Sequence, residues 1–198
     1  MSAITIHSIS DQDLVQQYII GHEPSLEELI RRHKAKIYTS IYLLVKDSYL
    51  AEDIFQDTFI KVINTLKAGK YNEEGKFLPW VIRIAHNLVI DHFRKEKRKP
   101  LVTTVDGFDI FEVIKFYDDS MEDKMIREQT HKDLRELIHH LPSDQKEVLI
   151  MRHFGELSFK EISELSGVSI NTALGRMRYA LNNLRKMMLT RELSLKKI

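Results

Sequence analysis

The stretch FKEISELSGVSINTALGRMR, residues Phe159–Arg178, decides the fold of the C-terminal part of this chain. Apolar residues recur at helical spacing on both sides of a Gly-Val-Ser tripeptide. Ser158 and Glu161 have the spacing of a capping box, which predicts a first helix over Phe159–Ser166. Ser169 can cap a second helix. Two helices joined by a short turn that contains glycine form a helix-turn-helix.

The side chains of this motif divide into two sets. The set expected to pack inward is Ile162, Leu165, Val168, Ala173 and Met177. The set expected to face outward near the start of the second helix is Ser169, Asn171, Thr172, Gly175, Arg176 and Arg178. Such a helix fits the major groove of DNA, where Asn, Thr and Arg can contact base edges or phosphates. The alternative is a structural αα-hairpin whose arginines are solvated.

The same helical period extends over nearly the whole chain. Only seven glycines and four prolines occur in 198 residues, and no strand-like alternation persists, so we predict an all-α fold. A capping box at Ser25–Glu28 suggests where one long helix begins. The expected helices run from Ser10 to about Ile20, Ser25 to about Val45, Asp47 or Ser48 to about Leu66, Phe77 or Pro79 to Pro100, Met121 to Leu141, Ser143 to about Phe154, and Ser169 past Arg185.

Charge is unevenly distributed along the chain. The formal net charge is only +1, but six basic and two acidic residues occur from Arg83 to Lys99, and seven basic and one acidic from Thr172 to Ile198. Between them, Leu101–Asp123 holds seven acidic residues and one lysine, and shows no sustained period. We therefore predict two helical domains, residues 1–99 and 121–198, joined by an acidic linker at residues 100–120.

Composition excludes several classes of protein. The chain is 43% hydrophobic and 30% charged, which is typical of a folded, soluble protein. It has no cysteine, so disulfides and thiolate metal sites are excluded. The nine histidines show no metal-ligand spacing, and no cofactor motif or catalytic triad occurs. No signal peptide or membrane span is recognisable, so we expect a cytoplasmic protein that is not an enzyme.

An aromatic and basic helix is predicted at Phe77–Arg94. Aromatic side chains near basic residues can stack unpaired bases. Large apolar residues at helical spacing are more often core residues, so we assign Trp80, Ile84, Leu88 and Phe93 to the core. Asn87 and the basic run are then the better candidates for nucleic-acid contact.

Asp53, Gln56 and Asp57 form the other unusual group. Their spacing places them on one side of a helix, as an acidic and polar face suited to a basic partner helix. A solvated helix face is the alternative interpretation of the same triplet.

Taken together, these segments resemble the extracytoplasmic function (ECF) group of bacterial sigma factors, the promoter-specificity subunits of RNA polymerase. The sequence AEDIFQDTFIKV is similar to the polymerase-binding helix of this family. FLPWVIRIAHNLVIDHFRKEKR is similar to its F-x-x-W-[LV]-x-x-I-A-x-N-x-x-x-D-x-x-R pattern. LPSDQKEVLIMRHFGELSFKEISELSGVSINTALGRMRYALNNLRK is similar to its L-P-x-x-x-[RK] helix and helix-turn-helix.

The resemblance implies roles for particular residues. It implies that the polymerase largest subunit docks on Asp53, Ile54, Gln56, Asp57 and Phe59. The implied contacts to the single-stranded -10 element are Lys70, Tyr71, Asn72, Lys76, Arg83, Asn87, Asp91, Arg94, Lys95 and Arg98. The implied contacts to the -35 duplex are Ser169, Asn171, Thr172, Gly175, Arg176 and Arg178. Core RNA polymerase, promoter DNA and an anti-sigma factor are the implied partners.

Two departures from the family pattern lie in the second helix of the motif. Leu174-Gly175 stands where many relatives have Lys or Arg followed by Ser, and Tyr179 replaces a frequent basic residue. One basic contact is therefore absent, and Gly175 can let a partner approach the backbone closely.

The resemblance implies a sigma factor that directs polymerase to promoters. A stand-alone helix-turn-helix repressor or activator, which would bind duplex DNA tightly without polymerase, is the alternative. A helical interaction protein, such as a sigma-binding antagonist, is the third possibility, and it would not need the basic segments.

Overall fold

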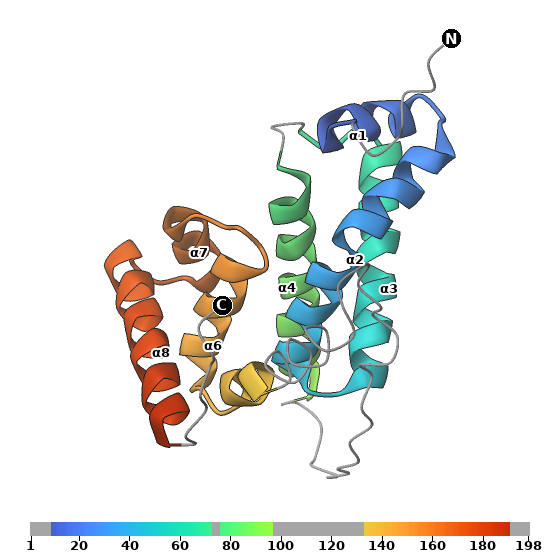
Figure 1. Ribbon diagram of the computed structural model, residues 1–198. Coiled ribbons are helices and arrows are strands. Elements are labelled where there is room, and N and C mark those ends of the chain that lie inside the picture. The colour runs from blue at the N-terminus through green and yellow to red at the C-terminus, as the bar shows by residue number, and fades with distance from the viewer. Residues whose placement is uncertain (1–8, 73–75, 97–132, 191–198) are drawn as a thin grey trace, which may run out of the picture. The chain divides into compact units, whose positions relative to one another are not determined.

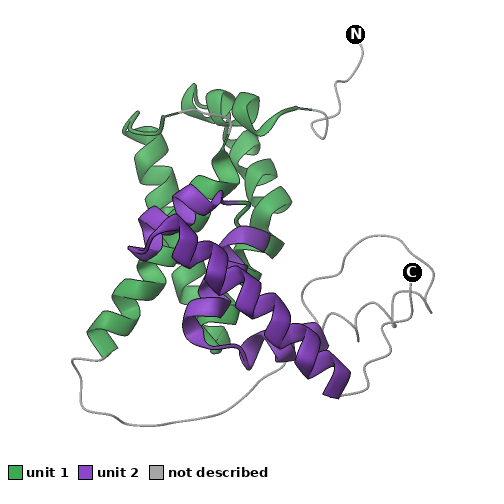
Figure 2. Ribbon diagram, turned by 90° about the vertical axis from the view of Figure 1, so that its left-hand side faces the viewer, with its two compact units in different colours: residues 1–107, 154–156 green, residues 108–153, 157–198 purple. Residues whose placement is uncertain are grey.

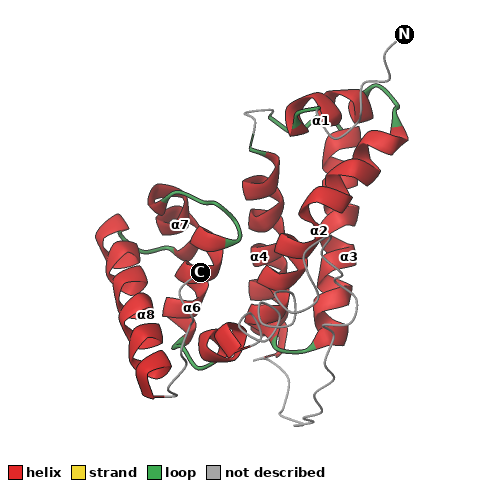
Figure 3. Ribbon diagram, in the orientation of Figure 1, coloured by secondary structure: helices red, strands yellow, loops and turns green. Residues whose placement is uncertain are grey.

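The computed structural model (Figure 1) describes residues 9–72, 76–96 and 133–190. Within these ranges every regular element is a helix (Figure 3), as predicted from the helical period. The chain divides into two compact units (Figure 2), one made of residues 1–107 with 154–156 and the other of residues 108–153 with 157–198. Each unit is built around its own apolar core.

The described residues of the first unit form a bundle of four helices. Helices α2, α3 and α4 pack against one another, with successive helices antiparallel, and α1 lies at the end of the bundle where α2 begins (Figure 1). The core includes fully buried side chains from all four helices, such as Leu14, Leu29, Leu66 and Phe77. The helices are α1 (Asp11–Ile19), α2 (Glu23–Val45), α3 (Ser48–Lys67) and α4 (Phe77–Glu96).

Side-chain caps fix two of these helix starts where the sequence predicted them. The side chain of Ser10 accepts a hydrogen bond of 3.1 Å from the Asp13 N–H, and α1 begins at the next residue. The side chain of Asp47 accepts one of 2.9 Å from the Leu50 N–H, and α3 follows. Both caps satisfy backbone donors that a helix leaves unpaired in its first turn.

The predicted start of α2 is wrong by two residues. The helix begins at Glu23, with Pro24 in its first turn, a position where a missing N–H costs nothing. Ser25 is therefore inside the helix and almost fully buried, and its Oγ donates to Gln17 Oε1 at 2.6 Å. The Oγ also lies 2.7 Å from His22 Nδ1, so the hydroxyl connects α2 to α1 instead of forming the predicted capping box.

Arg32 ties the short helix α1 to α2. Its guanidinium donates to the Ile9 carbonyl at 2.7 Å, to Asp11 Oδ1 at 2.9 Å and to Glu28 Oε1 at 2.8 Å. Burial lowers the pKa of Arg32, but the hydrogen bonds and charges of Glu28 and Asp11 outweigh burial and raise the pKa. A helix of only nine residues is marginal by itself, so this anchor and the burial of Leu14, Val15 and Tyr18 together hold α1 in position.

The predicted core face of α4 is also wrong. Trp80, Ile84 and Leu88 are only half-buried, and Phe93 is 39% exposed. The apolar residues of α4 cover a wide arc, so the centre of the arc could not be located from spacing alone. The side chains that enter the core are Phe77, Leu78, Val81, Ile82, Ala85 and Val89.

The second unit is a smaller helical cluster. A helix covers residues 133–139, followed by α6 (Ser143–His153), α7 (Phe159–Ser166) and α8 (Ile170–Thr190). Helices α6 and α7 both pack on α8. The fully buried side chains at the centre include Leu137, Ile150, Leu157, Ile162 and Ala173.

The turn between α6 and α7 is held by Arg152. Its Nη1 donates to the Leu157 carbonyl at 2.9 Å, and its guanidinium lies 5.4 Å from the centre of the Phe159 ring. The predicted capping box then starts α7: Ser158 Oγ accepts from the Glu161 N–H, and Glu161 Oε2 accepts from the Ser158 N–H at 2.8 Å. This part of the helix-turn-helix prediction is confirmed.

Several predictions fall outside the described residues. These are the acidic linker at residues 100–120, the helix stop at Pro100, the first part of the helix expected from Met121, and the side chain of Arg98.

Candidate functional site

One exposed face of α3 carries the acidic and polar residues predicted from the sequence. Asp53, Gln56 and Asp57 are all exposed to solvent. Ile54 and Phe59, predicted to share this face, are only 5% and 6% exposed. They belong to the core, where the Phe59 ring lies 4.9 Å from that of Phe55. Their role is to hold α3 in the bundle so that the polar residues point outward.

Two large apolar side chains that sequence analysis missed lie on the same face. Tyr49 is 78% exposed and Ile60 is 55% exposed. Their positions, four residues before and seven after Asp53, place them in line with it along the helix. We call Tyr49, Asp53, Gln56, Asp57 and Ile60 the α3 face. The spacing was visible in the sequence, but only the packing of α3 shows which side is free.

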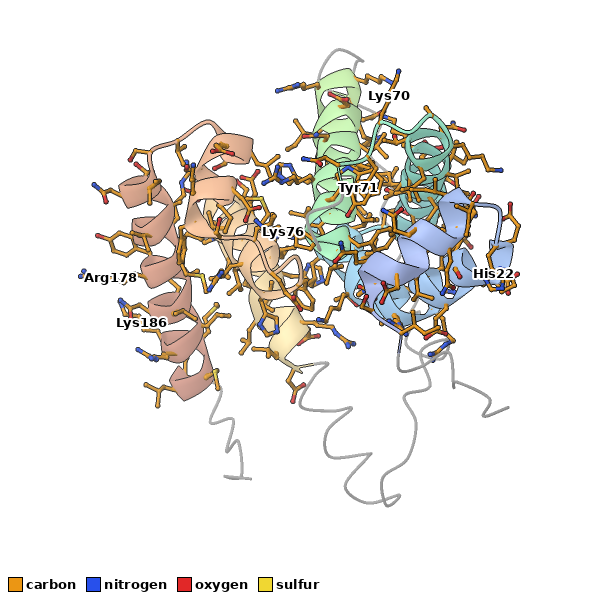
Figure 4. All side chains as sticks on the ribbon, turned by 90° about the horizontal axis from the view of Figure 1, so that it is seen from above. His22, Lys70, Tyr71, Lys76, Arg178 and Lys186 are labelled. Atoms are coloured by element: carbon orange, nitrogen blue, oxygen red, sulfur yellow. The ribbon has the colours of Figure 1, made fainter. Side chains whose placement is uncertain are left out.

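A short loop follows α3 and leads toward α4. Gly69 adopts a positive φ of 63°, and the Lys70 N–H bonds back to the Thr65 carbonyl at 3.1 Å, which closes the end of the helix. Lys70, Asn72 and Lys76 are exposed, and Tyr71 is half-buried. Figure 4 shows Tyr71 beside α4 and Lys70 at the outer edge of the loop.

Tyr71 and Trp80 form an aromatic pair between this loop and α4. Their ring centres are 4.3 Å apart, with the planes tilted by 44°. Trp80 also lies near Phe77, at 6.0 Å between ring centres. Trp80 thus packs against a loop residue at the edge of the bundle, and both rings keep part of their surface exposed.

The exposed face of α4 continues from Trp80. Asn87, Asp91, Arg94 and Lys95 are exposed, and Arg83 is half-buried. The spacing of Trp80, Arg83, Asn87, Asp91 and Arg94 puts them on one side of the helix. Arg94 Nη1 lies 3.5 Å from Asp91 Oδ1, a weak surface pair that leaves the arginine available to a stronger acceptor.

The turn between α7 and α8 positions the second candidate surface. Gly167 ends α7 with a positive φ of 65°, the conformation that favours glycine. Ser169 Oγ accepts from the Thr172 N–H at 3.1 Å and caps α8 as predicted. The two hydroxyls of Ser169 and Thr172 also lie 2.9 Å apart, so each already has a partner in the chain.

The predicted inward and outward sets of α7 and α8 are confirmed in part. Ile162 and Ala173 are fully buried. The other three inward residues, Leu165, Val168 and Met177, are half-buried. Ser169, Asn171, Thr172 and Arg178 are exposed as expected, whereas Gly175 is half-buried. Figure 4 shows Arg178 and Lys186 projecting from the outer side of α8.

Arg176 differs from the outward position predicted for it. Its side chain is 25% exposed, and its Nε lies 3.2 Å from Asp144 Oδ2 at the start of α6. Asn183, further along α8, donates to Gln145 Oε1 at 2.8 Å on the same side. These contacts show that Arg176 stands at the edge between α8 and α6, whereas Arg178 stands on the open face.

The described residues contain no group of three or more His, Cys, Asp or Glu side chains that could hold a metal ion. None of the described helices is long and apolar enough to cross a membrane.

Comparison with known families gives two matches, one to each part of the chain. The model of sigma-70 region 2 matches residues 29–99, and that of sigma-70 region 4 matches residues 131–182. Region 2 thus covers the α3 face and α4, and region 4 covers α6, α7 and most of α8. The chain belongs to the sigma-70 family, as an ECF sigma factor. It directs RNA polymerase to promoters and acts without enzymatic chemistry.

Curated relatives match over most of the chain. The ECF RNA polymerase sigma factor SigW of Bacillus subtilis is 27% identical over 176 residues, 87% of this chain and 93% of SigW. The RNA polymerase sigma-H factor of Pseudomonas aeruginosa is 28% identical over 171 residues, 84% of this chain and 88% of the relative.

Solved structures share the fold of this sigma factor. CnrH, solved in complex with the cytosolic domain of CnrY, is 17% identical, with a TM-score of 0.59 over 92% of this chain and 99% of CnrH. The sigma factor RpoE of Bartonella quintana, solved with the anti-sigma factor NepR, is also 17% identical, with a TM-score of 0.61 over 87% and 98% of the two chains.

Proposed function

We propose that this sigma factor docks on core RNA polymerase through the α3 face. Three polar side chains and two large exposed apolar ones share this surface. An interface needs apolar side chains to desolvate and polar ones to set orientation, and Tyr is among the residues enriched at binding hot spots. The acidic pair Asp53 and Asp57 suits a basic partner helix.

The proposed -10 contacts combine the loop after α3 with the exposed face of α4. Lys70, Tyr71, Asn72 and Lys76 come from the loop, and Arg83, Asn87, Asp91, Arg94, Lys95 and Arg98 come from the helix and the residues after it. Asn87 is exposed, and it lies about two turns along α4 from Trp80. The partly exposed Tyr71 and Trp80 rings offer a stacking surface for an unpaired base, which Asn87 can contact by hydrogen bonds.

The proposed -35 contact is the outer face of α8. This helix carries Arg176, Arg178, Arg185 and Lys186 and no acidic residue between Ile170 and Thr190. The single observation that best supports duplex binding is that every charged residue of α8 is basic. The helix is capped at Ser169, and Asn171, Thr172 and Arg178 near its start are exposed. Basic side chains supply most of the affinity for DNA, and side chains near the start of the helix supply the selectivity.

The remaining parts of the proposal concern organisation and partners. Residues 1–99 form the polymerase and -10 domain, residues 100–120 the acidic linker, and residues 121–198 the -35 domain. An anti-sigma factor is a further proposed partner, since the structurally similar RpoE was solved with one. The protein acts in the cytoplasm, where it meets polymerase and the chromosome.

The test of this function is transcription from host genomic fragments by core polymerase with and without the protein. We expect discrete new start sites that share two upstream sequence elements. These start sites should be lost in a variant that combines Asp53→Ala, Gln56→Ala and Asp57→Ala. A matched triple of exposed residues elsewhere in the first unit, Gln12→Ala, Gln16→Ala and Glu27→Ala, should keep them. Absence of new starts with folded wild-type protein and active polymerase would contradict the proposal.

A further inference from the structure

The face of α8 that carries Arg178 also carries exposed apolar side chains. Leu174 is 44% exposed and Ile170 is 45% exposed. Leu174 lies three residues after Asn171 and four before Arg178, so the three side chains are neighbours on one side of the helix. Among the described residues, Leu174 therefore presents an apolar surface to solvent between polar and basic side chains.

Gly175, the next residue, points to a close partner at the same place. A Cβ added to Gly175 would meet no other atom within 4 Å, and its φ is not in the region that favours glycine. A glycine within a helix is destabilising relative to alanine. The described residues leave space for a side chain here, and a glycine at this position permits a partner to approach the α8 backbone closely.

We propose that Leu174 reads the C5-methyl group of a thymine in the -35 element, with Ile170 completing the apolar contact. This inference rests on the proposed function of α8. Thymine is the base that presents a methyl group in the major groove of unmodified DNA, and apolar side chains are what contact it. Asn171 and Arg178 flank Leu174 with groups that bind base edges or phosphates, and Gly175 lets the duplex come within reach of a short, uncharged side chain.

The surroundings of Leu174 favour DNA over a protein partner as the occupant of this surface. The four charged residues of α8 are all basic, and Arg178 and Lys186 project from its outer side (Figure 4). A partner protein would have to supply an apolar and acidic surface. The experiment below distinguishes such a protein from DNA.

The experiment uses the full-length protein, core polymerase and a promoter found in the genomic transcription assay. Each thymine of the -35 element is replaced in turn by deoxyuridine, which keeps base pairing and the O4 acceptor but lacks the methyl group. We expect loss of one buried methyl to lower the affinity of the holoenzyme for the promoter about fourfold at one position. Leu174→Ala should bind the thymine and deoxyuridine promoters equally.

The control is Leu189→Ala, an 80% exposed leucine on the same helix, about 22 Å further along its axis. It should keep the full thymine preference. Leu174→Gln gives a second variant that retains side-chain length without the apolar end.

Equal affinity for thymine and deoxyuridine at every position, or an unchanged preference in Leu174→Ala and Leu174→Gln, overturns the inference while promoter-specific transcription stands. A -35 element without thymine overturns it as well. If Leu174→Ala binds DNA normally but loses a protein partner, Leu174 belongs to a protein interface. Absence of transcription from every fragment instead overturns the proposed function, and the inference with it.

Discussion

Arg176 and Arg178 are two residues apart on α8 but have different surroundings. Arg176 is paired with Asp144 at 3.2 Å, and Arg178 is exposed on the outer face. The sequence could place both arginines on the helix, but not the carboxylate, which comes from α6. A contact between residues so far apart in the chain depends on the packing of two helices, which periodicity does not describe.

Arg178→Ala should therefore weaken promoter binding more than Arg176→Ala. An arginine that contacts a base contributes about 1–3 kcal/mol of discrimination. Arg176 must first leave Asp144, so its net contribution to binding is smaller. Quantitative footprinting of the holoenzyme on a promoter and on a variant -35 element measures the effect of each substitution on promoter affinity and on discrimination. A larger effect of Arg176→Ala than of Arg178→Ala would show that the ion pair with Asp144 does not reduce the contribution of Arg176 to promoter binding.

Ile54 and Ile60 provide a matched pair on α3. Ile54 is 5% exposed and Ile60 is 55% exposed. Ile54→Ala should lower the free energy of unfolding by about 2–5 kcal/mol, as expected for a buried isoleucine. Ile60→Ala should leave stability nearly unchanged and weaken binding to core polymerase. Chemical denaturation and a polymerase-binding titration separate the two effects. Normal polymerase affinity of Ile60→Ala would remove this residue from the α3 face.

At the scale of whole elements, sequence was most informative where a local hydrogen bond fixes a helix end. Ser10, Asp47, Ser158 and Ser169 cap the helices that were expected to begin beside them. The start of α2 was missed because Pro24 fits the first turn of a helix, and α2 begins two residues ahead of Ser25.

The side of a helix that faces the core was harder to predict than the residues at which the helix begins and ends. On α4 the apolar arc was wide enough to suggest the wrong core face, and Trp80 pairs with Tyr71 in a loop instead. On α3, Ile54 and Phe59 were predicted to contact RNA polymerase but lie in the core. In both helices, the packing of neighbouring helices decides which side chains stay exposed to solvent. Sequence spacing shows only which residues share a side of the helix.

Gly175→Ala should make the protein more stable and less active. Alanine is about 1 kcal/mol more favourable than glycine in a helix interior, and its Cβ has open space here. The unfolding temperature of the second unit should rise by about 4–8 °C, the shift expected for 1 kcal/mol in a small domain. The same methyl group would hold DNA away from α8. Thermal denaturation and promoter affinity test the two effects, and unchanged affinity would show that no surface approaches Gly175.

At the scale of the whole molecule, the chain consists of two units with separate cores, and each matches a different sigma-70 region. Ile41 in α2 and Ile162 in α7 are both almost completely buried, one in each unit. Proteins with more than one domain commonly unfold in more than one step.

Ile41→Ala and Ile162→Ala should thus affect different unfolding steps. Each removes the same side chain from a core, at a cost of about 2–5 kcal/mol. Differential scanning calorimetry of the full chain should show one transition lowered by the first substitution and a different one lowered by the second. A single transition shifted by both would indicate that the two units unfold together.

The pairing of Arg176 with Asp144 has a consequence for how binding responds to ionic strength. Each phosphate neutralised by a protein cation releases a bound counterion from DNA. When Arg176 turns from Asp144 to a phosphate, the exposed carboxylate is left to attract a cation from solution, which offsets part of that release. Promoter affinity should then decrease less steeply with salt than the number of basic residues on α8 suggests. The exposed Asp144 carboxylate should thus make promoter recognition less sensitive to ionic strength.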